Sequence, residues 1–236
     1  MRLRGPDEQP LTDEFDVVCR ALDLKDARVL ELGCGAAEKT RQIASGGADE
    51  VVAAEVDATQ HAKNLQADVP ANVVFKAYGA EHIEEEDASF DAVVMFKSLH
   101  HVPVQDMQRA MAEIARVLKP GGRAYISEPV FEGDFNEVIR LFHDEEAVRS
   151  AAFEAVCESV EQGVFALKEQ IFFRNRVRLE AFEQFERGIL NATHTDHQLT
   201  QALYEQVRAK FESFKSDQGF VFDVPNRVDL LEKPVA

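Results

Sequence analysis

Two glycines and an acid stand where a ligand-binding turn would need them. Gly33 and Gly35 lie in the run Glu31-Leu-Gly-Cys-Gly35, at the end of an apolar stretch. Glycine at both places lets a ligand approach the backbone, because a Cβ would fill that space. The third glycine of the dinucleotide-binding fingerprint is absent, since Glu38 takes its place. Glu31 suits a ligand with a cationic amine better than one with an anionic pyrophosphate.

A second acid follows the next apolar run. Glu55 comes directly after residues 51–54, where a carboxylate can accept hydrogen bonds from both hydroxyls of a ribose. Asp57 competes for this role, but it is also placed to cap the helix predicted to follow. We favour Glu55 as the ribose ligand and Asp57 as the cap.

Histidines supply the other candidate chemistry. His100 and His101 follow the fourth apolar run, where an imidazole could act as a general base. A group transfer that depends on alignment needs no such base, and this alternative stays open. His194 and His197 flank Asp196, but their close spacing and the lack of a fourth partner favour a solvated loop. The sequence therefore predicts no metal site.

Three arginines form a second pattern. Arg174, Arg176 and Arg178 alternate with other residues at the period of a strand, so their side chains share one face. This ladder would either receive an anionic ligand or face outward. We favour the outward orientation, with pairing to nearby acids such as Glu180, Glu183 and Glu186.

The elements that must position these residues follow from the periodicity. Short β-branched runs predict strands at 28–32, 50–54, 73–76, 90–96 and 124–127. Amphipathic stretches predict helices at 12–23, 37–45, 58–67 and 104–118. Strands that alternate with helices predict an α/β fold with a doubly wound, mostly parallel sheet. Its ligand site is expected at the carboxyl ends of the strands.

The pattern changes in the second half of the chain. Residues 130–216 are predicted to be a mainly helical insertion or cap, interrupted by one strand-like segment. The runs 220–224 and 227–232 are split by Pro225-Asn226, which predicts a terminal antiparallel hairpin that completes the sheet.

The amino-acid composition indicates which classes of binding partner are favourable. Acidic residues outnumber basic ones 43 to 26, for a net charge of −17, so nucleic acid is an unfavourable partner and a small molecule a favourable one. No apolar stretch predicts a signal peptide or a membrane span. The three cysteines form no CxxC pair, which favours a reducing, cytoplasmic location. The oligomeric state stays open.

Together these motifs resemble those of the class I S-adenosylmethionine (SAM)-dependent methyltransferases of the small-molecule type, with a Rossmann-like core. The resemblance covers about residues 12–129 and the terminal runs. Besides the glycine turn and Glu55, it is carried by Tyr78-Gly-Ala-Glu81, Ser89-Phe-Asp-Ala-Val-Val94, Leu99-His-His-Val102 and Arg116-Val-Leu-Lys-Pro-Gly-Gly122.

The resemblance also implies site residues. Glu31, Gly33, Cys34 and Gly35 would surround the methionyl part of SAM, and Glu55 with Val56 would meet the ribose. Phe96 and Lys97 would lie near the sulfonium and the methyl acceptor. The turn Gly79-Ala80-Glu81 would lie against adenine. The family commonly has an aspartate where this chain has Gly79, so Glu81, a backbone carbonyl or packing alone would hold the adenine.

The implied function is methyl transfer from SAM to a small-molecule acceptor. Residues 1–129 would form the SAM-binding core, 130–216 an acceptor-binding cap, and 217–236 the closing hairpin. A nicotinamide-dependent oxidoreductase or epimerase is the alternative enzyme, but it predicts a third glycine and a Tyr-x-x-x-Lys pair that the chain lacks. A non-catalytic SAM-binding module is the third reading.

Overall fold

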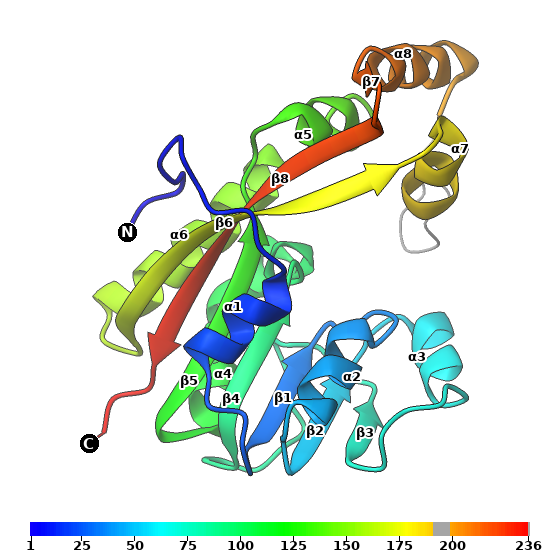
Figure 1. The fold of residues 1–236 in the computed structure, drawn as a ribbon. Helices are drawn as coiled ribbons and strands as arrows, with labels where there is room; N and C mark the ends of the chain where they lie inside the picture. The colour runs from blue at the N-terminus through cyan, green and yellow to red at the C-terminus, as the bar shows by residue number, and fades with distance from the viewer. Residues whose placement is uncertain (191–198, 236) are drawn as a thin grey trace.

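A mixed β-sheet forms the centre of the molecule (Figure 1). The structure is a computed structural model and describes residues 1–190 and 199–235. Within these residues the sheet has the order β3-β2-β1-β4-β5-β8-β6, and β7 pairs with β8. The strands are β1 (Arg28–Leu32), β2 (Glu50–Ala54), β3 (Val73–Lys76), β4 (Phe90–Phe96), β5 (Leu118–Pro129), β6 (Ala166–Leu179), β7 (Lys215–Ser216) and β8 (Gly219–Glu232). Strands β1 to β5 pair in parallel and β8 runs antiparallel to its neighbours, so the predicted fold class is confirmed.

Helices cover both faces of the sheet. They are α1 (Glu14–Ala21), α2 (Glu38–Ser45), α3 (Ala58–Asn64), α4 (Met107–Val117), α5 (Asp134–Ile139), α6 (Glu146–Glu161), α7 (Phe182–Phe185) and α8 (Gln201–Glu212). Short 3-10 turns span Leu99–His101 and Val104–Asp106, and a π-helical turn spans Glu186–Leu190. In the part of the chain that the structure describes, none of these helices is long and apolar enough to span a bilayer.

The continuous apolar runs of the central strands reflect burial on both faces. Alternate residues of β4 contribute to opposite cores: Val93 packs toward α4 and α6, whereas Val94 packs toward α1 and α2. A strand covered on both faces needs apolar side chains at every position, which is why it lacks the polar alternation of a half-exposed strand.

The predicted terminal hairpin forms, but not at Pro225-Asn226. Strand β8 continues through both residues, and the sheet reverses between β7 and β8 instead. Pro225 lies opposite Arg174, whose backbone N–H and C=O bond to Pro10 and Thr12. Arg174 and Pro225 therefore form a non-hydrogen-bonded pair of the antiparallel ladder. Because no hydrogen bond joins β6 and β8 at this pair, the N–H that proline lacks is not missed there.

Residues 130–216 contribute both to the cores on the two faces of the main sheet and to a separate hydrophobic core, called the second core below. Helix α6 packs through Ala152 and Val156 into the core of the main sheet. In contrast, α7 and α8 pack against the far half of the long β6–β8 ribbon, which projects away from the parallel strands (Figure 1). This second core is rich in phenylalanine: Phe182, Phe185, Phe211, Phe220 and Phe222.

Two ion pairs on β8 differ in burial and provide a matched test. Asp229 is fully buried and accepts from Arg227 Nε at 2.8 Å and from Gln170 Nε2 at 2.7 Å. Asp223 accepts from Arg176 at 2.7 and 2.8 Å, but both side chains are more than a third exposed.

We predict that Asp229→Ala lowers the free energy of unfolding by about 3–5 kcal/mol, because Arg227 would remain buried without its partner. Asp223→Ala should change it little, since solvent screens an exposed pair. Urea unfolding of both variants measures this, and equal effects would contradict the assignment of Asp229 as the structural acid.

Candidate functional site

Two neighbouring cavities concern the predicted site residues. The larger one lies at the carboxyl ends of strands β1 to β4, which is where an open α/β sheet binds its ligand. It has a volume of about 930 Å³. Of the predicted cofactor residues, it is lined by Gly33, Gly35, Glu55, Val56, Gly79, Ala80, Glu81 and Lys97. Glu31, Cys34 and Phe96 do not line it.

The glycine turn needs its glycines for two separate reasons. Gly33 has φ +72° and Gly35 has φ +51°, in the left-handed region that favours glycine. A Cβ on Gly33 would also lie 2.6 Å from Cβ of Ser98, so the loop after β4 packs directly on this turn. The N–H groups of Gly33 and Cys34 both donate to Ala54 O, which ties the turn to the end of β2.

Asp57 caps the helix that follows it, as the sequence predicts, whereas Glu55 lies in the wall of the larger cavity. Asp57 Oδ1 accepts from the N–H groups of Thr59 and Gln60 and caps α3. Glu55 is 8% exposed and accepts from Gly35 N and Asp57 N at 2.8 Å each. A carboxylate has about four acceptor positions, so each oxygen of Glu55 can accept a further hydrogen bond.

The three predicted residues that do not line the larger cavity, Glu31, Cys34 and Phe96, pack inside the protein. Glu31 is buried and accepts from Thr40 Oγ1 at 2.6 Å, and burial raises its pKa to about 7 against the opposing effect of that hydrogen bond. Burial likewise raises the pKa of the Cys34 thiol. The ring of Phe96 packs on Tyr125, with 5.6 Å between centroids.

The departure from the family pattern at Gly79 has a structural counterpart. The carboxylate of Glu81 folds back over Gly79 and occupies the space that a side chain at position 79 would need. The Glu81 carboxylate thus places an acidic group directly beside Gly79, and both residues line the larger cavity.

The two histidines differ in their surroundings. His100 is buried, and its Nδ1 is hydrogen-bonded to Glu128 at the end of β5. Glu128 also accepts from Leu99 N at 2.9 Å. His101 is exposed and lines the larger cavity, and its ring contacts that of His100 in a tilted arrangement with 4.1 Å between ring centroids.

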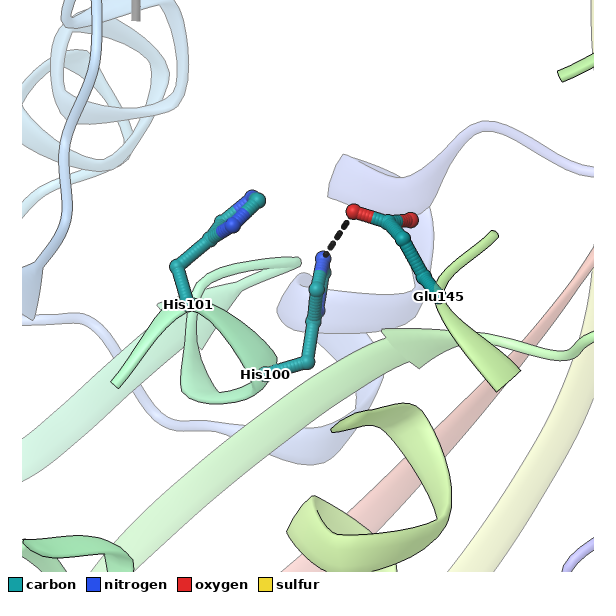
Figure 2. Close-up of side chains that lie close together, drawn as sticks. All are labelled: His100, His101 and Glu145. Atoms are coloured by element: carbon teal, nitrogen blue, oxygen red, sulfur yellow. Dashed lines mark ion pairs between the residues drawn. The ribbon is translucent and has the colours of Figure 1, made fainter. Parts of the chain in front are cut away.

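Glu145, directly before α6, completes this group (Figure 2). Its Oε1 lies 3.5 Å from His100 Nε2 and 2.9 Å from His143 Nε2, and its Oε2 lies 2.5 Å from Arg149 Nη2. Burial alone would lower the pKa of His100, but Glu128 and Glu145 outweigh it and raise that pKa to about 9. Burial would raise the pKa of Glu145, but His100 and Arg149 together lower it.

The sequence did not predict Glu128 or Glu145 as residues of the site. Glu128 carried a usable signal, because it ends a parallel strand and therefore lies at the same edge as His100. Glu145 carried none, since it comes from the region after the fifth strand, for which no motif predicted a position.

A smaller cavity of about 290 Å³ adjoins the histidines on the side of the second core. It shares Lys97 and His101 with the larger cavity. Its polar lining also includes His100, Asn136, His143, Glu145, Arg149 and Asn175, and its apolar lining includes Phe135, Ile139, Phe142, Val177, Ile189 and Val224.

The arginine ladder pairs differently from our expectation. Arg176 pairs with Asp223, its cross-strand neighbour in register, and Arg174 donates to Asp7 O. Two of the three acids expected as partners bind elsewhere, since Glu183 pairs with Arg208 and Glu186 accepts from Tyr204. Register across a β ribbon placed Asp223 closer than helix residues further along the chain. His194, Asp196 and His197 lie outside the described residues.

Comparison with known proteins agrees with this geometry. A family model described as a methyltransferase domain matches residues 29–122. The 27-O-demethylrifamycin SV methyltransferase of Amycolatopsis mediterranei is 34% identical over 43% of this chain and 38% of its own length. The ubiquinone biosynthesis O-methyltransferase of Xanthomonas oryzae is also 34% identical, over 48% of this chain and 47% of its own. The chain thus spans less than half the length of these relatives.

The fold extends beyond these matches. The YcgJ protein of Bacillus subtilis has a similar fold over 94% of this chain and 98% of its own, with a TM-score of 0.63 at 19% identity. The family match covers β1 to the start of β5, which are the strands whose ends build the larger cavity. Residues 29–122 of this chain therefore match a methyltransferase domain, and the fold that contains them is shared well beyond the matched residues.

Proposed function

We propose that this protein binds SAM in the larger cavity and transfers its methyl group to a small molecule held in the smaller one. The observation that carries the proposal is the shared wall: Lys97 and His101 line both cavities. Methyl transfer by in-line displacement depends on holding two molecules end to end, and adjoining cavities provide this arrangement. The cytoplasmic location stays a prediction.

The residues of the larger cavity fit the cofactor. SAM supplies an electrophilic methyl group on a positively charged sulfur. Glu55 retains acceptor positions for ribose hydroxyls, and Glu81 offers a carboxylate for the adenine amino group. Glu31 lies behind the glycine turn, where a nearby cationic amino group would favour its ionised form.

The smaller cavity supports an apolar acceptor that carries a hydroxyl group. Its walls of phenylalanine, isoleucine and valine suit an aromatic or aliphatic body, and its lining also includes His101 and the polar group formed by His100, His143, Glu145 and Arg149. The two relatives described above are named for transfer to oxygen atoms. We therefore place the accepting hydroxyl beside His101, next to the larger cavity.

A panel of acceptors tests this function. The enzyme and SAM are incubated with hydroxylated aromatic and polyketide compounds, and product is detected as S-adenosylhomocysteine release with the mass gain of one methyl group. Each compound is matched with its own O-methyl ether, which should give no turnover. Methylation confined to amines or carboxylates would contradict transfer to oxygen.

Glu55 and Asp57 offer a matched pair for the cofactor. Glu55→Gln should weaken binding of S-adenosylhomocysteine at least tenfold, about 1.4 kcal/mol, because the ribose loses a charged acceptor. Asp57→Ala should leave this affinity nearly unchanged but lower stability by about 0.5–2 kcal/mol, through loss of the α3 cap. Calorimetric titration and thermal unfolding measure both. If the effects are reversed, Asp57 is the ribose ligand.

A residue swap tests the adenine contact. Glu81→Ala should weaken S-adenosylhomocysteine binding several-fold, because it removes the carboxylate over Gly79. Combining it with Gly79→Asp should restore affinity, since the acid returns from the neighbouring position into space that Glu81 no longer fills. Failure of the double variant to recover, with an unchanged melting temperature, would show that packing rather than a carboxylate holds the adenine.

A further inference from the structure

His100, His101 and Glu145 bring three metal-ligand side chains together at the junction of the two cavities. One ligand atom from each lies within 4.8 Å of the others. Figure 2 shows the two histidines rising from the loop after β4 toward the carboxylate that precedes α6. The group therefore joins the parallel sheet to the region beyond β5.

The spacing between His100 and Glu145 suits a bridging ion better than a direct hydrogen bond. His100 Nε2 and Glu145 Oε1 are 3.5 Å apart, beyond the usual N–H···O range of about 2.7–3.2 Å. Two ligands about 2.0–2.1 Å from a tetrahedral zinc ion lie roughly 3.3 Å apart. A small movement of the His101 side chain would bring it into position as the third ligand of such a site.

The surroundings of His100 also match those of a metal ligand. Its Nδ1 is held by the buried carboxylate of Glu128, which fixes the ring and directs Nε2 toward Glu145. A carboxylate behind a histidine is the usual support of a zinc-binding imidazole. Glu145 keeps Oε1 toward the histidines because Arg149 binds Oε2.

We propose that His100, His101 and Glu145 bind a divalent transition-metal ion, Zn²⁺ in first place, between the cofactor and acceptor cavities. Two imidazoles and one carboxylate leave the fourth position open, as in catalytic rather than structural zinc sites. His143, which contacts Glu145 Oε1 and lines the smaller cavity, is the nearest candidate for a fourth protein ligand. The ion would replace the proton on His100 Nε2, since a ligating imidazole is neutral.

Metal binding can be measured without methyl transfer, so its test uses the metal alone. Chelator-treated protein is titrated with Co²⁺, whose visible absorption reports coordination by nitrogen and oxygen, and then with Zn²⁺ by calorimetry. We expect one ion per chain, with an affinity that falls at least tenfold in His101→Ala and in Glu145→Gln. Displacement of Co²⁺ by Zn²⁺ should abolish the absorption.

Controls separate the site from folding and from surface binding. His101 is exposed, so His101→Ala should fold normally even if Glu145→Gln disturbs Arg149. His82→Ala removes an exposed histidine outside the cluster and should leave metal affinity unchanged. The proposal is overturned if the wild-type protein gives no Co²⁺ absorption, or if a correctly folded His101→Ala variant binds Zn²⁺ as tightly as wild type.

Discussion

The position of the smaller cavity depends on one backbone constraint, the continuity of β8 through Pro225. After Pro225, β8 lies between β5 and β6, whereas before it β8 has left β5 and pairs with β6 and, at its start, with the short strand β7. A turn at Pro225 would separate the second hydrophobic core from the sheet. As one strand, β8 carries Val224 into the wall of the smaller cavity and Phe222 into the second core, so the smaller cavity is built on the same sheet as the larger one.

Buried acids mark the same edge of the sheet. Glu31, Glu55 and Glu128 end or follow β1, β2 and β5, and each is at least nine-tenths buried. Burying a carboxylate is costly unless hydrogen-bond donors or a cation compensate. Backbone N–H groups serve Glu55, and His100 serves Glu128. Glu31 has one hydroxyl donor, and burial raises its pKa, so this end of the site gains most from a cationic ligand.

The sequence was sufficient for features that depend on local pattern. The parallel strands, the glycine turn and the cap at Asp57 all follow from the neighbouring residues. The sequence did not predict the features that depend on how distant segments pair. The role of Pro225 depends on which atoms of Arg174 face it, and the partner of Arg176 depends on β6–β8 register. Glu145 meets His100 only because α6 packs on the main core, a contact without a local signal.

The loop after β4 carries the two histidines at the junction of the cavities, and hydrogen bonds to its neighbours set its shape. Lys97 has φ +55°, an uncommon conformation for a residue with a side chain, and such strain persists only where surroundings enforce it. Its N–H donates to Ser127 O at 2.7 Å, and Ser98 Oγ donates to Leu32 O at 2.8 Å. These bonds anchor the loop to β5 and β1, while Gly33 leaves room for Ser98. His101 is thereby held between the two cavities by the protein itself, and under the proposed function this fixed position would lower the entropic cost of aligning two bound molecules.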